Sequence, residues 1–299
     1  MRTQPNLHAS LQHMLGIFGT KDAWKMWVCF LLMPVNWAIE ARKWYVLVHR
    51  EQPFTFKRAF QSVLSGISLS LTTPNRIGEF GGRILHLDPA TRLKGVALTL
   101  YSSIAQLLIT LLIGLPVLYF LSSDILEWYH VEQETEKWFW ICYILTVLAT
   151  LAIGLFYFRF HWLIVCTSRI PFLQKYFPVG DTSLTLPFKL SFSVLGYSLL
   201  RYLVFSAQYV LLWQALGADI GIIEGVMGIA LVFFLMSVVP TIALVELGMR
   251  GKLAIGVMAL FSINHIAILT GTVVIWLLNL ILPALAGSVQ MFTVKLFKA

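Results

Sequence analysis

Residues 72–83 read TTPNRIGEFGGR, and this stretch governs how the rest of the chain is interpreted. A proline and clustered glycines interrupt the backbone, while Arg76, Glu79 and Arg83 place charges in a chain that is otherwise strongly apolar. Ionisable side chains at membrane depth are costly and usually face a protein interior or a water-filled cavity. The stretch therefore predicts a broken or sharply turned backbone that carries a polar site.

A second stretch, residues 239–251, reads VPTIALVELGMRG and has a similar layout. In both stretches a proline is followed five or six residues later by a glutamate, and an arginine follows four residues after the glutamate. This spacing places Glu79 with Arg83, and Glu246 with Arg250, on one face of a helix. We call residues 72–83 the first motif and residues 239–251 the second motif, and we take them as the functional centre.

The composition indicates a membrane protein. Of 299 residues, 58% are hydrophobic and 12% are charged, whereas about 25% are charged in soluble domains. Several apolar runs exceed the roughly 20 residues that cross a bilayer as a helix. The net charge of +8 is typical of cytoplasmic loops and of segments near anionic headgroups, so we expect no nucleic-acid partner. The chain is predicted to be one all-α integral membrane domain over residues 1–299.

The predicted architecture has about six spanning helices plus two opposed re-entrant hairpins. The long apolar candidates cover residues 23–48, 93–121, 138–158, 190–215 and 265–296. The segment 60–71 is too short to span and suits a re-entrant helix. We therefore expect a first hairpin over residues 55–92 and a second hairpin over residues 224–263, each broken at its motif.

The distribution of Lys and Arg predicts the orientation. Basic residues occur at the carboxyl end of the first span and at the carboxyl end of the chain, which places these two points in the cytoplasm. Residues 122–137 contain a single lysine and therefore belong outside. The first hairpin then begins and ends inside and the second begins and ends outside, the inverted layout of many secondary transporters. Residues 1–22 fall outside despite Arg2 and Lys21, so either the orientation evidence fails locally or a preceding helix is missing. The expected location is the bacterial inner (plasma) membrane.

The first motif resembles the signature of the lysylphosphatidylglycerol-synthase membrane-region family, also called flippase-like. Three further stretches support the resemblance, in order along the chain: residues 34–44, 239–251 and 282–287. Members of that family are integral membrane proteins proposed to move polar lipids between leaflets. Because residue 299 follows directly on the last predicted helix, we expect no aminoacyl-transfer domain, and the resemblance then implies a stand-alone member with the membrane half of that activity. Family members usually begin with one more transmembrane helix.

The candidate substrate-binding residues belong to the two motifs: Pro74, Arg76, Gly78, Glu79, Arg83, Pro240, Glu246 and Arg250. Two interpretations compete. The Glu–Arg pairs either neutralise each other, or the arginines bind an anionic headgroup, to which their planar forks are suited. Other polar positions within spans, namely Asn36, Glu40, Gln106, Gln208 and Asn279, are expected to form interhelical hydrogen bonds. Arg201 is expected to extend to the cytoplasmic interface, and a role as a further site residue is the alternative.

The expected function is translocation of a polar or anionic lipid, or of a lipid-linked intermediate, across the membrane. The alternative is a non-transporting membrane subunit that binds a lipid or an enzyme partner acting on that lipid. The chain carries no HExxH or GxSxG motif and no phosphate-binding glycine loop, so we expect neither an enzyme nor a cofactor or metal site. Membrane lipids are the expected partners, and the oligomeric state is not predicted.

Overall fold

The computed structural model describes residues 21–73, 76–162, 186–238 and 243–293, together with Gly16 and Gly19. The regular structure in these ranges is entirely helical, which confirms the all-α class. The helices are α2 (Ala23–Val48), α3 (Phe56–Leu71), α4 (Gly78–Ile84), η3 (Pro89–Thr91), α5 (Arg92–Phe120), α6 (Ser122–Trp128), α7 (Gln133–Phe158), α10 (Phe188–Ala215), α11 (Ile222–Val238), α12 (Ala243–Met258), α13 (His265–Trp276), η4 (Leu277–Ile281) and α14 (Leu282–Thr293).

Four described helical stretches are long and apolar enough to cross a membrane: Pro89–Phe120, Gln133–Phe158, Phe188–Ala215 and His265–Met291. They are the helices of an integral membrane protein. Helix α2 has 26 residues, but its second half contains Asn36, Glu40 and Lys43, all buried. The expected number of about six spans is therefore not reached within the described chain. Most of residues 1–22, and much of the predicted connector over 159–189, lie outside the described residues.

The first hairpin consists of α3 and α4, which pack antiparallel. Thr55 caps α3, its side chain accepting a hydrogen bond from the backbone N–H of Arg58. At the other end of α3, the Thr73 hydroxyl donates to the Leu69 carbonyl and accepts from the Gly78 N–H at 2.7 Å, which joins the end of α3 to the start of α4. The break thus precedes Glu79 and Arg83, and both of these residues lie within α4.

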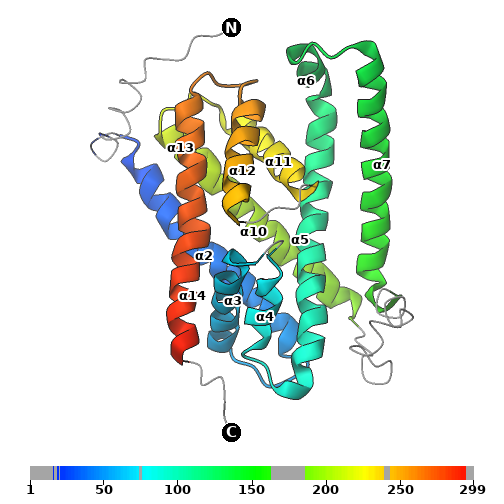
Figure 1. Ribbon diagram of the computed structural model, residues 1–299, viewed down its shortest axis with the longest axis vertical. Helices are drawn as coiled ribbons and strands as arrows, with labels where there is room; N and C mark the ends of the chain where they lie inside the picture. Colours follow the sequence, from blue (N-terminus) through cyan, green and yellow to red (C-terminus); the bar gives the residue numbers. More distant parts are fainter. Residues whose placement is uncertain are drawn as a thin grey trace.

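The second hairpin consists of α11 and α12, also antiparallel, with Gly228 of α11 against Met258 of α12. Figure 1 shows α3 and α4 in the lower half of the molecule and α11 and α12 in the upper half. Helix α12 begins at Ala243, so Glu246 and Arg250 of the second motif lie on its early turns. The two hairpins approach each other from opposite ends of the molecule (Figure 1).

Small residues allow α3 to contact two other helices closely. A Cβ on Gly82 would lie 2.3 Å from the Ser65 carbonyl oxygen, and a Cβ on Gly287 would lie 2.2 Å from the Leu64 carbonyl oxygen. Real Cβ atoms do not approach backbone this closely, so α4 and α14 can occupy these places only with glycine. Helix α3 is held between α4, α14 and the buried face of α2, where the Trp44 indole donates to the Ser62 hydroxyl at 2.8 Å.

Helix α7 stands at one side of the molecule, beside α5 (Figure 1). Only Thr150 and Tyr157 of this helix are buried, while large apolar side chains such as Leu148, Leu151 and Leu155 are more than half exposed. An apolar helix with this exposure is stable in lipid and not in water. The surface of α7 therefore supports the placement of the chain in a membrane.

We expect Gly82→Ala to lower the melting temperature of the purified protein in detergent. The new Cβ meets the backbone of Ser65 and Gly66, which cannot move aside as a side chain can, and overpacking of this kind costs about 1–3 kcal/mol. Gly196→Ala on α10 is the matched control, because its Cβ would have no atom within 4 Å. Melting temperatures are measured by tryptophan fluorescence. Equal values for the two variants would contradict the close contact between α3 and α4.

Candidate functional site

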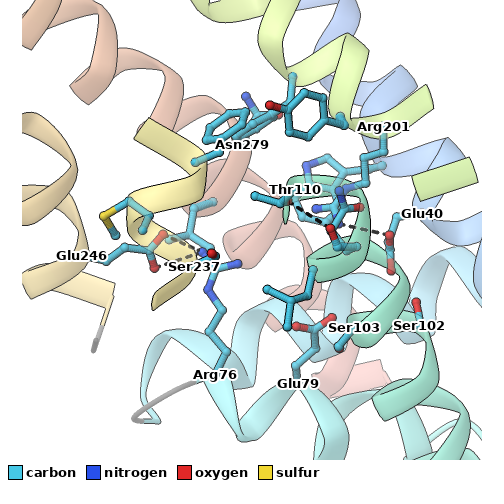
Figure 2. Close-up of a pocket in the computed structure, with 18 of the residues that line it drawn as sticks. Glu40, Arg76, Glu79, Ser102, Ser103, Thr110, Arg201, Ser237, Glu246 and Asn279 are labelled. Atoms are coloured by element: carbon cyan, nitrogen blue, oxygen red, sulfur yellow. Dashed lines mark hydrogen bonds and ion pairs between the residues drawn. The ribbon is translucent and has the colours of Figure 1, made fainter. Parts of the chain in front are cut away.

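A cavity of about 540 Å³ lies between the two hairpins and helices α2, α5, α10 and α13–η4. Its wall combines aromatic side chains with an unusual density of charge for a membrane interior. Figure 2 shows labelled side chains from these elements converging on the cavity. The charged residues that line it are Glu40, Lys43, Arg76, Glu79, Arg83, Arg201, Glu246 and Arg250.

The carboxylate of Glu40 is the centre of one charged cluster. It is 1% exposed and contacts three cations: Lys43 Nζ at 2.9 Å, Arg83 Nη2 at 2.6 Å and Arg201 Nη1 at 3.1 Å. Arg83 also pairs with Glu79. These contacts connect α2, α4 and α10, because a buried charge is tolerated only when it is paired and hydrogen-bonded.

A second charged cluster joins the two motifs. Arg76 Nη2 donates to both carboxylate oxygens of Glu246, each at 3.1 Å, across 170 residues of sequence. Glu246 is buried and also pairs with Arg250, whose guanidinium donates to the Tyr209 hydroxyl at 3.3 Å. Figure 2 shows Arg76 and Glu246 pointing toward one another from the two hairpins. The sequence motifs therefore meet in space.

Arg76 has a left-handed backbone, with φ at +56°. Residues other than glycine rarely adopt this region, and they do so mainly where the surrounding structure or a function requires it. The side chain of Arg76 is 42% exposed, so burial of apolar surface does not explain the strain. The conformation directs the guanidinium of the first hairpin onto the carboxylate of the second hairpin.

Buried amides continue the polar wall. Asn36 Nδ2 donates to Asn279 Oδ1 at 3.1 Å, and Asn36 Oδ1 accepts from Arg201 Nε at 3.3 Å. Asn279 lies in the π-helical turn η4, between α13 and α14. Such turns are rare and often occur at functional sites. The interhelical hydrogen bonding expected of Asn36 and Asn279 is confirmed.

The structure brings together five of the eight predicted site residues: Arg76, Glu79, Arg83, Glu246 and Arg250 all line the cavity. Gly78 does not line it; a Cβ there would lie 2.1 Å from the Leu69 carbonyl oxygen, so Gly78 serves the turn and the packing of α4 on α3. Pro74 and Pro240 lie outside the described residues. Both predicted Glu–Arg pairs at four-residue spacing form.

Sequence reasoning missed three residues of the site. Arg201 was expected at the interface, but its guanidinium binds Glu40 and lies 5.1 Å from the centre of the Trp37 ring. Lys43 was counted among the basic residues that mark a cytoplasmic end, yet it is 1% exposed and ion-paired. Glu40 was expected only to hydrogen-bond. The three-residue spacing of Glu40 and Lys43, which suits an intrahelical ion pair, was the available signal.

No protein-family model matches the sequence, and no curated protein matches it.

We expect Glu40→Gln to destabilise the protein strongly. The change leaves Lys43 and Arg201 without their carboxylate in low dielectric, a loss of about 3–5 kcal/mol for a buried pair. Glu134→Gln is the control, since Glu134 and Lys137 form an exposed pair on α7, which contributes little. Thermal unfolding in detergent compares the two. Equal melting temperatures for the Glu40→Gln and Glu134→Gln variants would show that the ion pairs of Glu40 do not hold the helices together.

Proposed function

We propose that this protein translocates a polar or anionic lipid, or a lipid-linked intermediate, across the membrane. The observation that carries the proposal is the charged cavity between two opposed helical hairpins, in a protein whose long helices are apolar. Charges at membrane depth are expensive, and they are retained where they bind a substrate or form a pathway. Here they line a cavity of about 540 Å³ instead of filling a packed core.

The hairpins fit a transporter. Helix α3, with 16 residues, is shorter than the roughly 20 residues that span a bilayer, and the described part of α11, with 17, is at the lower limit of that length. We infer that both hairpins are re-entrant and enter from opposite faces, with their ion-paired tips near the membrane centre. Broken helices that meet at a midplane site are the common design of secondary transporters. Non-helical backbone at that depth is tolerated where it lines a cavity or is buried in protein.

The resemblance of the first motif to the flippase-like family supports the same function. The three other stretches that carry the resemblance also contact the site or its support: residues 34–44 supply Glu40 and Lys43, residues 239–251 supply Glu246 and Arg250, and residues 282–287 include Gly287 against α3. We propose that the chain is a stand-alone member of that family, resident in a bacterial inner membrane.

The mechanism that we propose follows from the chemistry of the wall. Arginine forks bind phosphate oxygens with two hydrogen bonds, so the guanidinium groups of Arg76 and Arg250 would hold the headgroup while the acyl tails stay in lipid. The glutamates keep these arginines oriented when no headgroup is bound. The competing function, a lipid-binding subunit without transport, uses the same contacts but needs no passage between leaflets.

Arg76→Gln tests the proposal. The side chain is part-exposed at a turn, so we expect the variant to fold, with a melting temperature within a few degrees of the parent. We expect a loss of at least about tenfold in translocation rate, the effect of removing one charge-assisted contact of about 1.5–3 kcal/mol. The assay is dithionite bleaching of fluorescent phospholipids in liposomes that contain the purified protein.

Lys94→Gln is the control for that assay, because its ion pair with Glu51, at 3.1 Å, lies away from the cavity. It should translocate lipid like the parent protein. A parent protein that bleaches no more lipid than empty liposomes would favour the binding subunit. Full activity in Arg76→Gln would remove the cross-hairpin pair from the mechanism.

A further inference from the structure

The charges that line the cavity do not balance. Five basic side chains face three carboxylates, which leaves two formal positive charges. Each of the five cations contacts a carboxylate, so the excess is not a misplaced surface residue but is built into the network. An excess of two charges within a low-dielectric wall creates a strong positive potential, and such a cleft concentrates anions.

The excess is divided between the two clusters. Around Glu246, two guanidinium groups share one carboxylate. Around Glu40, three cations share that carboxylate and the carboxylate of Glu79. Each cluster thus carries one positive charge that no described carboxylate of the cavity neutralises. Both clusters face the same space, so one ligand that bears two negative charges would compensate both.

The remaining polar atoms of the wall are mainly donors. The indole N–H groups of Trp37 and Trp276 and the hydroxyl of Tyr202 are buried, line the cavity, and have no hydrogen-bond partner among the described residues. The same holds for Nε of Arg83 and of Arg250. Among the acceptors that line the cavity, Gln106 Oε1 is the one that is likewise buried without a hydrogen-bond partner among the described residues. Buried donors without acceptors are costly, and the wall around the cavity therefore holds more unpaired donors than unpaired acceptors among the described residues.

We propose that the cavity selects a dianionic phosphate group, a phosphate monoester or a diphosphate, over the phosphodiester of common phospholipids; this rests on the proposed function. A phosphate monoester carries about −1.5 to −2 charges at pH 7 and three acceptor oxygens, whereas a phosphodiester carries one negative charge. The monoester therefore matches the charge excess of the cavity. Either a lipid headgroup or a soluble phosphate compound could present this group.

Binding to the purified protein, measured by microscale thermophoresis in detergent, tests the selection. The probes are dioleoyl phosphatidic acid, dioleoyl phosphatidylglycerol and dioleoyl phosphatidylethanolamine, with glycerol 3-phosphate as a soluble dianion and inorganic pyrophosphate as a soluble, more highly charged diphosphate. We expect phosphatidic acid to bind about ten- to a hundredfold more tightly than phosphatidylglycerol, the effect of one further charge-assisted interaction. Equal affinity for the two lipids at pH 7.5 would overturn the proposal.

The soluble probes identify the source of the phosphate. Glycerol 3-phosphate that competes with phosphatidic acid at similar affinity supports the dianion and assigns it to a soluble ligand. Weak competition supports the dianion on a lipid.

The pH dependence of binding is a second check. Affinity for phosphatidic acid should rise from about pH 5 to pH 8, since the second phosphate proton leaves near pH 6. Affinity for phosphatidylglycerol, measured over the same pH range, reports any titration of the cavity wall itself. The titratable and charged groups that face the phosphate are Glu40, Lys43, Arg76, Glu79, Arg83, Arg201, Tyr202, Tyr209, Glu246 and Arg250.

Charge variants give a matched pair of opposite sign. Arg76→Gln reduces the excess to one charge, so the preference for phosphatidic acid over phosphatidylglycerol should fall to less than about threefold, one charge-assisted contact having been lost. Glu79→Gln raises the excess to three, and both lipids should bind more tightly. Lys94→Gln, outside the cavity, should retain the parent preference. An unchanged preference in Arg76→Gln, or unchanged affinities for both lipids in Glu79→Gln, would overturn the proposal.

Failure of this inference differs from failure of the proposed function. Translocation of all three lipids at equal rates, without selective binding, would overturn the selection of a dianion and leave the transport function intact. Selective binding of phosphatidic acid by a protein that translocates no lipid would support the selection and reject transport.

Discussion

The ion pairs of Glu40 are the interaction on which the rest of this structure depends. A carboxylate inside an apolar helical protein must be paired, or the protein loses several kcal/mol. Here one carboxylate accepts from Lys43 of its own helix, from Arg83 of the first hairpin and from Arg201 of α10. Three segments far apart in sequence are thereby fixed around one point. Arg83 belongs to a helix of only seven residues, which has little packing surface of its own and is held in place by these charges and by the glycine contacts with α3.

Under the proposed function both hairpins are re-entrant, and their short helices end inside the membrane. A helix that ends inside an apolar medium leaves backbone groups without partners. Side chains satisfy part of this need in the first hairpin, where Thr73 links the carbonyl of Leu69 to the N–H of Gly78. The ion pair from Arg76 to Glu246 then joins the tip of one hairpin to the other. The polar cavity is a consequence of opposing two such tips.

The fold and half of the site could be predicted because their signals are local. Apolar runs long enough to span a bilayer predicted the bounds of α5, α7 and α10 to within about five residues. The four-residue spacing of Glu and Arg predicted both ion pairs of the motifs. The contribution of α2 and α10 to the site depends on contacts that are not local. Lys43 follows Arg42 in a basic segment, and only tertiary packing distinguishes the buried side chain of Lys43 from the exposed one of Arg42. Likewise, nothing near Arg201 in the sequence identifies Glu40 as its partner. The π-helical turn at Asn279 has no sequence signature that separates it from the surrounding helix.

The contact between Arg76 and Glu246 bears on how a headgroup could pass between the hairpins. The pair links the two tips directly, so a ligand that moves between leaflets through this cavity has to replace it. A phosphate can do so without leaving a bare charge, because its oxygens compete with the Glu246 carboxylate for the same guanidinium. Glu246 retains Arg250 as a partner during the exchange. Arg250 on the second hairpin thus limits the free-energy cost of separating the hairpins in low dielectric. Under the proposed function, the ligand shifts the equilibrium toward the separated state because it binds that state better.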